Sequence, residues 1–533
     1  MEKHNNTRKK TQGNEMKLLM VCQILVIIVL LFILMGLNWD WLRTQIEPGL
    51  IVSMIVSIIV TLVATVLGGL MIGWIIKYVT HLRFYIRPYL TFESDNTQVF
   101  HLSKKVETLE YSVGEKGWKE LDSQNIVFGG ARGKLLLRGN SSIGTDGAMI
   151  SFASNAEVVC SGDIRTLIDY KHYDEADTSK AVFESLFCGC KQLVVAPELL
   201  AENLADSCYS FMFLRCTSLK TAPELPAENL TNECYYGMFS GCTSLTEAPE
   251  LPAKILTERC YADMFYGCAS LEFVPDLAAK NLAKWCCAGM FEKCTSLKKA
   301  PLLSAENMAS CCYVYMFSGC TSLEFAPELL AMNLADSCYS NMFSGCTSLK
   351  VATELPAVNL ANSCYSYMFS GCTSLVCTPE LPAEILTESC YSNMFSGCSS
   401  LIVAPELPSV HLAERCYADM FSGCTSLEVA HELPANDLVD SCYSSMFAGC
   451  ISLKCAPILA AKNLANGCCF YMFADCSSLS EITMLATDNN ALCSFMGWTS
   501  RISPFGTFYK NKDAKWENKS IVPDGWEVKL IDP

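Results

Sequence analysis

Cysteine is the residue type in this chain whose number and spacing most suggest chemistry. Thirty-two cysteines occur in 533 residues. One set, which we call the opening cysteines, recurs every 26 residues from Cys190 to Cys476, and a second set keeps the same period from Cys208 to Cys468. Thiols can form disulfides, bind metal ions or act as nucleophiles, so each of these uses has to be weighed.

A fixed period places each set of cysteines in a column along a stack of repeated units. Side chains in register on neighbouring strands are about 4.8 Å apart, whereas disulfides prefer a Cβ separation of about 3.8 Å. Cysteine is also among the residues most often fully buried, where it behaves as a small hydrophobe. We therefore predict buried free thiols. Pairing within a unit, for example Cys208 with Cys216, is the main alternative.

The sequence predicts no metal site, no cofactor and no catalytic residue. Only six histidines occur, and none is in phase with the cysteine columns. The Cys-x7-Cys spacing is not that of a zinc finger or ribbon. No P-loop, GxSxG, GxGxxG or HExxH motif occurs in a convincing context. A cysteine protease needs one cysteine paired with a histidine, whereas these cysteines are repeated as framework, which is the opposite of a unique nucleophile. We expect a protein that is not an enzyme, the alternative being an active site in the N-terminal β module.

The cysteines belong to a unit of the form Cys-Thr-Ser-Leu-x-x-Ala-Pro-Glu-Leu-Pro-Ala-x-Asn-Leu-x-x-x-Cys-Tyr-x-x-Met-Phe-x-Gly. A period of this length is typical of a solenoid, in which each unit buries its apolar face against its neighbours. Residues 218–225 read as an extended segment. Residues 208–213 read as one or two helical turns, because Cys208, Met212 and Cys216 recur at steps of four. The predicted class is an α/β repeat solenoid with a short strand and a helical turn in each unit.

One column of the repeat is acidic and is the candidate interaction surface. Stacked like charges repel, so the column needs solvent, counter-ions or a basic partner. A solvated edge and a surface for cations or basic ligands both remain open. The column begins at Glu198, is interrupted by Leu302 and Ile458, and contains Glu224, Glu250, Asp276, Glu328, Glu354, Glu380, Glu406 and Glu432.

Two further columns of the repeat, one variable and one of asparagine, also face the question of function. The two positions after the leucine that recurs in every unit vary, as in Lys220-Thr221, Glu272-Phe273 and Ile402-Val403. A constant framework with variable side chains is how repeat proteins present a recognition surface, and drift at an exposed site is the alternative. An asparagine column, which includes Asn281 and Asn307, is expected to cap backbone groups at a turn.

The N-terminal region predicts membrane attachment. A basic tail, residues 1–17, precedes apolar runs at residues 18–37 and 49–76, so residues 18–80 are expected to form a hairpin of two transmembrane helices. Positive charge flanks both outer ends, which predicts a repeat domain on the cytoplasmic side, with the cell surface as the alternative. The remaining predicted parts are a small β module (87–163), a transition (164–189), the repeats (190–498) and a C-terminal cap (499–533).

The net charge of −16 and pI near 5.0 argue against nucleic acid as a partner of the repeats.

The core motif Met-Phe-x-Gly-Cys-Thr-Ser-Leu, present at residues 238–245 and 342–349, resembles that of BspA-type leucine-rich repeat proteins of anaerobic bacteria. The resemblance implies a curved leucine-rich solenoid and a role in surface attachment or host interaction. Members are commonly exported, whereas this chain has no lipobox. We therefore expect a membrane-anchored scaffold that binds a protein or other macromolecule. The alternative is a cell-surface adhesin for host or extracellular macromolecules.

Overall fold

The computed structural model describes residues 88–122, 125–487, 494–516 and 521–532. The chain divides into two compact units, Met1–Arg87 and Pro88–Pro533. The fold described below is that of the second unit, and the predicted transmembrane hairpin, residues 18–80, lies outside the described residues.

The second unit begins with eight short strands in two sheets. They are β1 (Leu90–Glu93), β2 (Gln98–Leu102), β3 (Glu110–Val113), β4 (Lys119–Glu120), β5 (Ile126–Phe128), β6 (Leu135–Arg138), β7 (Ile150–Phe152) and β8 (Val158–Ser161). These eight strands pair antiparallel with one another, and the residues of most of them alternate between more and less buried with the period of two expected of half-buried strands. Phe92, Phe100 and Phe152 fill the core, with ring centroids 5.6–6.2 Å apart.

The larger sheet continues directly into the repeats. Its strand order is β4-β3-β6-β1-β8-β9, and β9 (Leu193–Val195) pairs parallel with β8. The 3-10 helices η1 (Gly130–Arg132), η2 (Ile164–Leu167) and η3 (Tyr173–Glu175) lie in the connections. The first repeat therefore stacks on a preformed sheet edge.

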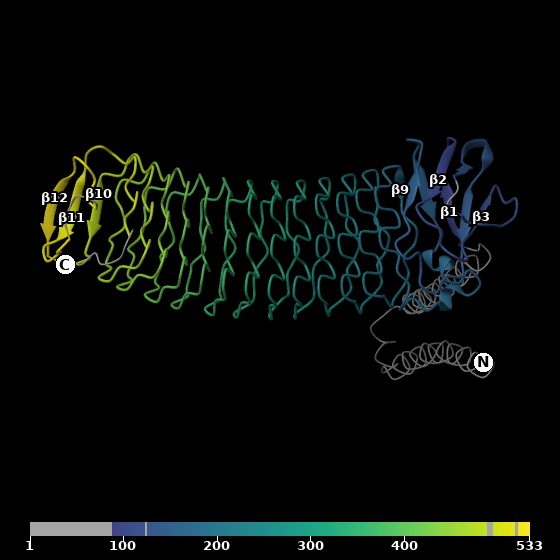
Figure 1. The fold of residues 1–533 in the computed structure, drawn as a ribbon, viewed down its shortest axis with the longest axis horizontal. Helices are drawn as coiled ribbons and strands as arrows, with labels where there is room; N and C mark the ends of the chain where they lie inside the picture. Colours follow the sequence, from purple (N-terminus) through teal and green to yellow (C-terminus); the bar gives the residue numbers. More distant parts are fainter. Residues whose placement is uncertain (1–87, 123–124, 488–493, 517–520, 533) are drawn as a thin grey trace, which may run out of the picture. The chain divides into compact units, whose positions relative to one another are not determined.

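Each 26-residue unit forms one coil of the stack, which we call a rung (Figure 1). We number its positions 1 to 26 from the opening cysteine. Isolated parallel bridges join residues 26 apart at position 6 (Lys299 with Phe325), position 10 (Leu277 with Leu303) and position 14 (Asn281 with Asn307). The rungs therefore stack in register, as the period predicts.

Positions 17 to 26 form a run of turns in which alternate backbone N–H groups bond within the rung and to the next rung. The N–H of Tyr339 donates to the carbonyl of Cys364 at 3.0 Å, while the N–H of Met342 donates to the carbonyl of Tyr339 at 3.2 Å. Every fourth residue has a positive φ, as in Ser337 (55°), Asn341 (58°) and Gly345 (73°).

The predicted helical turns are therefore wrong, and so is the α/β class. A residue with positive φ at every fourth position prevents a right-handed helix. The described residues contain no α-helix, only strands, isolated bridges, turns and the three 3-10 helices. The spacing of four that suggested a helix does place Cys208, Met212 and Cys216 together in the core, but through repeated turns.

The prediction of a multi-pass membrane protein is also corrected. In the part of the chain that the structure describes, no helix is long and apolar enough to span a bilayer. The multi-pass localisation, and with it the cytoplasmic placement and the membrane contact through residues 18–80, is not retained.

The core of the stack consists of continuous columns of one residue type. Twelve phenylalanines at position 24, from Phe187 to Phe473, stack nearly parallel with centroids 5.4–5.7 Å apart. Tyrosines form a similar column at position 20, interrupted at Cys287 and Cys469. Leucine at position 4 and methionine at position 23 complete the buried set.

The C-terminal end closes these columns with an atypical segment. Trp498 is buried against Phe473, with centroids 5.8 Å apart, and its Nε1 donates to the carbonyl of Ile521 at 3.0 Å. A parallel sheet of β10 (Glu481–Met484), β11 (Thr507–Asn511) and β12 (Glu527–Ile531) covers the last rung. A terminal segment of this kind shields the last apolar layer from water.

Candidate interaction surface

The structure places every member of the predicted acidic column on the surface. The eight carboxylates of Glu224, Glu250, Asp276, Glu328, Glu354, Glu380, Glu406 and Glu432 are all exposed at position 9. None forms an ion pair within the described residues. One column of uncompensated negative charge therefore follows the stack.

An exposed hydrophobic column lies beside the acidic one, at position 6. We call Phe325, Val351, Cys377, Val403 and Val429 the apolar column; every one of these side chains is exposed. Phe325 is 63% exposed, although phenylalanine normally supplies core contacts. Parallel bridges join Val351 to Cys377 and Val403 to Val429, so the backbone holds these side chains in register.

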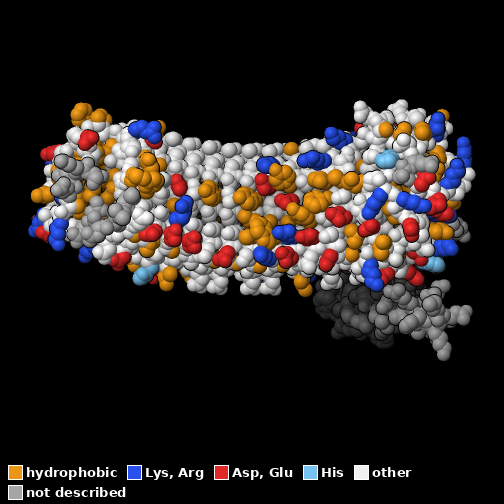
Figure 2. Space-filling model, viewed as in Figure 1, with side chains coloured by type: hydrophobic (Ala, Val, Ile, Leu, Met, Phe, Trp, Pro, Cys, Tyr) orange, Lys and Arg blue, Asp and Glu red, His pale blue; other side chains and the backbone are white. Residues whose placement is uncertain are grey.

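Position 5 adds mixed charged and aliphatic side chains to the same face. Lys298, Lys350 and Lys454 are exposed there, as are Val376 and Ile402. Hydrophobic and acidic side chains gather together along the face of the stack seen in Figure 2. The exposed residues of positions 5, 6 and 9 thus lie within five residues of one another along each rung.

The asparagine column does not cap turns as predicted, because its side chains bond to each other. Nδ2 of Asn307 donates to Oδ1 of Asn281 at 2.7 Å, and Asn359 donates to Asn333 at the same distance. In-register stacking brings identical amides within hydrogen-bonding distance, so one donates to the next along the stack.

The thiols of both cysteine columns are buried and free, so the alternative of a Cys208–Cys216 disulfide is wrong. Each opening cysteine from Cys216 onward donates its S–H to the backbone carbonyl of the phenylalanine 29 residues earlier in the chain. Cys320 Sγ, for example, lies 3.1 Å from the carbonyl oxygen of Phe291. Burial raises the pKa of Cys320 to about 12. The opening thiols, whose pKa burial raises in every rung, therefore stay protonated at neutral pH, which makes them packing groups and poor nucleophiles.

We expect the two cysteine columns to respond differently to serine. Cys320→Ser keeps a donor facing the Phe291 carbonyl and should lower the free energy of unfolding by about 1 kcal/mol. Cys338 has no such carbonyl partner among the hydrogen bonds of the described residues, so Cys338→Ser buries a poorly satisfied hydroxyl and should lower it by about 2–3 kcal/mol. Urea unfolding of the two variants provides the comparison, and equal losses would contradict the role assigned to the carbonyl.

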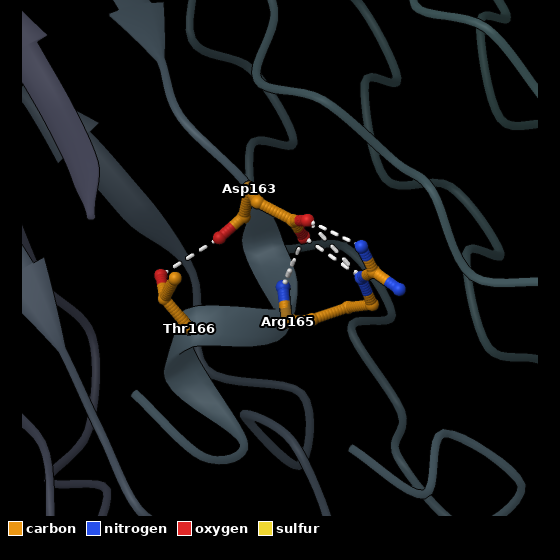
Figure 3. A network of polar contacts seen from close by, with 3 residues as sticks. All are labelled: Asp163, Arg165 and Thr166. Atoms are coloured by element: carbon orange, nitrogen blue, oxygen red, sulfur yellow. Dashed lines mark hydrogen bonds and ion pairs between the residues drawn. The ribbon is translucent and has the colours of Figure 1, made fainter. Parts of the chain in front are cut away.

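A buried ion pair at the start of the repeats was not predicted from the sequence. Asp163 is 1% exposed, and its carboxylate accepts from the backbone N–H of Arg165 at 2.9 Å and from the guanidinium at 2.7 Å (Figure 3). The Thr166 hydroxyl donates to the Asp163 carbonyl at 2.7 Å. Asp163 also forms a parallel bridge with Glu198 in the first rung. The network caps η2 and holds the β module against the first rung, so its role is structural.

A second unpredicted cluster lies on the turn segment of the rungs around residues 259–293. Most rungs carry small polar residues or glycine there, whereas this part carries Arg259, Asp263, Trp285 and Glu292. Burial, with a contribution from Glu292, raises the pKa of Asp263 to about 6. Gly289 leaves the room for that carboxylate, because a Cβ at this position would lie 2.3 Å from Asp263 Oδ1. Departure from the repeat consensus was the signal that could have revealed it.

Comparison with known families agrees with the repeat geometry. The model of the BspA type leucine-rich repeat region matches in six copies, over residues 174–298, 206–350, 315–405 and 413–495. These ranges cover more than half of the chain. No curated protein matches the sequence.

Proposed function

The chain belongs to the BspA-type leucine-rich repeat family, and we propose that it binds a protein partner through the face formed by positions 5, 6 and 9. The family suggests a role in protein interaction or adhesion. We propose that this chain acts by binding alone, as an interaction scaffold without catalysis.

The observation that carries the proposal is the exposure of large hydrophobic side chains beside unpaired carboxylates. Phe273 and Phe325 are each 63% exposed, and Val351 is 58% exposed. Contiguous exposed apolar surface bordered by polar groups is typical of interaction sites. Because parallel bridges fix the backbone at position 6, a partner would order few groups on binding.

Lysines at different repeat positions allow a direct test of which face is used. Lys220, Lys298, Lys299, Lys350 and Lys454 are exposed at positions 5 and 6, whereas Lys254, Lys280 and Lys284 are exposed at positions 13 and 17. The full protein would be incubated with an extract of its own cells, treated with a lysine-reactive cross-linker and digested for mass spectrometry. We expect cross-links to partner proteins to concentrate on the first group.

Substitution of the face supplies the matched control. Phe273→Ser with Phe325→Ser should reduce recovery of the same partner at least tenfold, since each removed ring is worth about 1–3 kcal/mol at an interface centre. Tyr367→Ser, at an exposed residue of the turn segment, should leave recovery unchanged. Cross-links spread evenly over both lysine groups, or equal losses in both variants, would refute the assignment of this face.

A further inference from the structure

Only in the rungs from residue 324 to residue 432 does every consecutive rung carry both a hydrophobic residue at position 6 and an acidic residue at position 9. The acidic column there is Glu328, Glu354, Glu380, Glu406 and Glu432. In earlier rungs Leu302 breaks the acidic column, and Thr221, Glu247 and Lys299 interrupt the hydrophobic side chains of position 6. Five consecutive rungs thus present one hydrophobic stripe and one negative stripe in parallel.

The dimensions of this double column are set by the stacking. Rungs about 4.8 Å apart give a length of about 19 Å over five rungs. Positions 6 and 9 are three residues apart along the backbone, so their Cα atoms lie at most about 10 Å apart. Parallel bridges joining Val351 to Cys377 and Val403 to Val429 hold the spacing constant.

The negative charge on this surface favours a partner that carries positive charge. Lys350 is the one lysine or arginine at positions 5, 6 and 9 between residues 324 and 432. The five glutamates make no ion pair with any described residue. Like charges held in register repel one another, and a partner with matching positive charges relieves that repulsion.

We propose that this double column binds an amphipathic α-helix that lies along the stack axis, with an apolar stripe on position 6 and a Lys/Arg stripe on position 9. This inference rests on the proposed function and specifies the partner of the same face. An α-helix is about 10–12 Å wide and repeats every 5.4 Å, so its side chains drift from the rungs by about 0.6 Å per turn. The drift over five rungs is about 2.4 Å, which long basic side chains absorb.

An extended strand fits the same surface poorly. Its side chains on one face recur every 6.6 Å or so, which departs from the rung spacing by about 1.8 Å at each step and by about 7 Å over five rungs. A helix also offers adjacent apolar and basic stripes within its own width, whereas a single strand places alternate side chains on opposite faces.

A designed peptide tests the inference on the full protein. The probe is a 15-residue peptide with leucine and lysine on adjacent faces of a helix, unstructured when free, and the control is a scrambled peptide of the same composition. In 50 mM salt we expect fluorescence anisotropy to show the patterned peptide binding at least fivefold more tightly than the scrambled one. Circular dichroism should show it gaining helix on binding.

Matched protein variants test whether peptide binding depends on this site or only on the net charge of the protein. Glu354→Lys, Glu380→Lys and Glu406→Lys together should raise Kd at least tenfold. Glu258→Lys, Glu388→Lys and Glu414→Lys make the same charge change at exposed residues of position 17 and should alter Kd less than twofold. Val351→Ser with Val403→Ser, which changes no charge, should raise Kd about fivefold or more. Unchanged circular dichroism spectra of the variants would show that each is folded.

The outcomes distinguish this inference from the proposed function. Equal losses in the two glutamate variants, or equal binding of both peptides, would overturn the double column as the site. Binding without gain of helix would overturn the helical partner. In any of these cases, cross-links from the lysines of positions 5 and 6 to a natural partner would leave the proposed function standing.

Discussion

Raising the pH from 8 to about 10.5 is expected to unfold the repeat stack. Burial raises the pKa of Cys320, Cys372 and Cys424 to about 12 each, whereas a thiol in an unfolded chain has a pKa of about 8.5. Between these values the unfolded state binds fewer protons than the folded state. The free energy of unfolding therefore falls as pH rises through this window, and the contribution of the thiols is complete only below about pH 8.5.

The expected loss of stability at high pH is large because many buried cysteines contribute to it together. Each buried thiol removes about 1.4 kcal/mol of stability per pH unit within the window. Twelve opening cysteines titrate in the same sense, so the loss exceeds the stability of a typical domain within about one pH unit. Far-UV circular dichroism against pH, under reducing conditions, measures the transition.

A variant with fewer thiols provides the control for this prediction. Replacing Cys320, Cys346 and Cys372 by alanine lowers the starting stability but should also make the dependence on pH shallower, by about three protons. A stack that keeps its spectrum to pH 11.5, or a slope unaffected by the three replacements, would contradict the assignment of the transition to buried thiols.

Phe343→Ala is expected to lower the free energy of unfolding by about 3–5 kcal/mol. Phe343 is 0% exposed and stacks between Phe317 and Phe369 with centroids 5.7 and 5.6 Å away. Its loss leaves a cavity that the neighbouring rungs cannot fill, because inter-rung hydrogen bonds fix their spacing. In a stack whose stability comes from nearest-neighbour contacts, this weakens two interfaces at once.

Urea unfolding followed by circular dichroism tests this expectation. The matched control is Tyr367→Ala, which removes a ring of similar size that is 41% exposed on the turn segment and should change stability by less than about 1 kcal/mol. A second transition in the Phe343→Ala variant would show the stack dividing at the altered rung. Similar losses in both variants would refute the view that the phenylalanine column carries the core.

The period and the residue types were enough to predict that the cysteine columns are buried and that the units stack in register. The opening cysteines, Leu349 and the Met342-Phe343 pair all lie in the core. The prediction that residues 208–213 form helical turns was wrong. Repetition at steps of four is close to the helical period, and Ser337 gives no sign in the sequence that it adopts a positive φ, although asparagine, as at Asn341, adopts that conformation more often than most residues. Glycine at position 26 was the available warning, since it favours that conformation.

The surface was predictable in part. The acidic side chains were correctly expected to face solvent, because a column of charge cannot be buried without partners. The hydrophobic half of the face was harder to recognise, because Phe273 and Phe325 have the composition of core residues. Their exposure follows from the parallel bridges at position 6, which fix the direction of each side chain. The junction at Asp163 depends on contacts between distant segments, and no local pattern encodes these.

The tyrosine column is interrupted at Cys287, between Tyr261 and Tyr313, and again at Cys469, so the interfaces beside these two residues lack tyrosine stacking and keep only that of the phenylalanine column. The rungs of a solenoid bear a pulling force in series, and each interface carries the full load. Adding rungs therefore makes the stack longer without making it stronger. The force at which the stack breaks is the force that its weakest interface can bear. The smaller side chains at Cys287 and Cys469 mark the interfaces at which such a stack should yield first, with the rungs on either side parting as intact blocks.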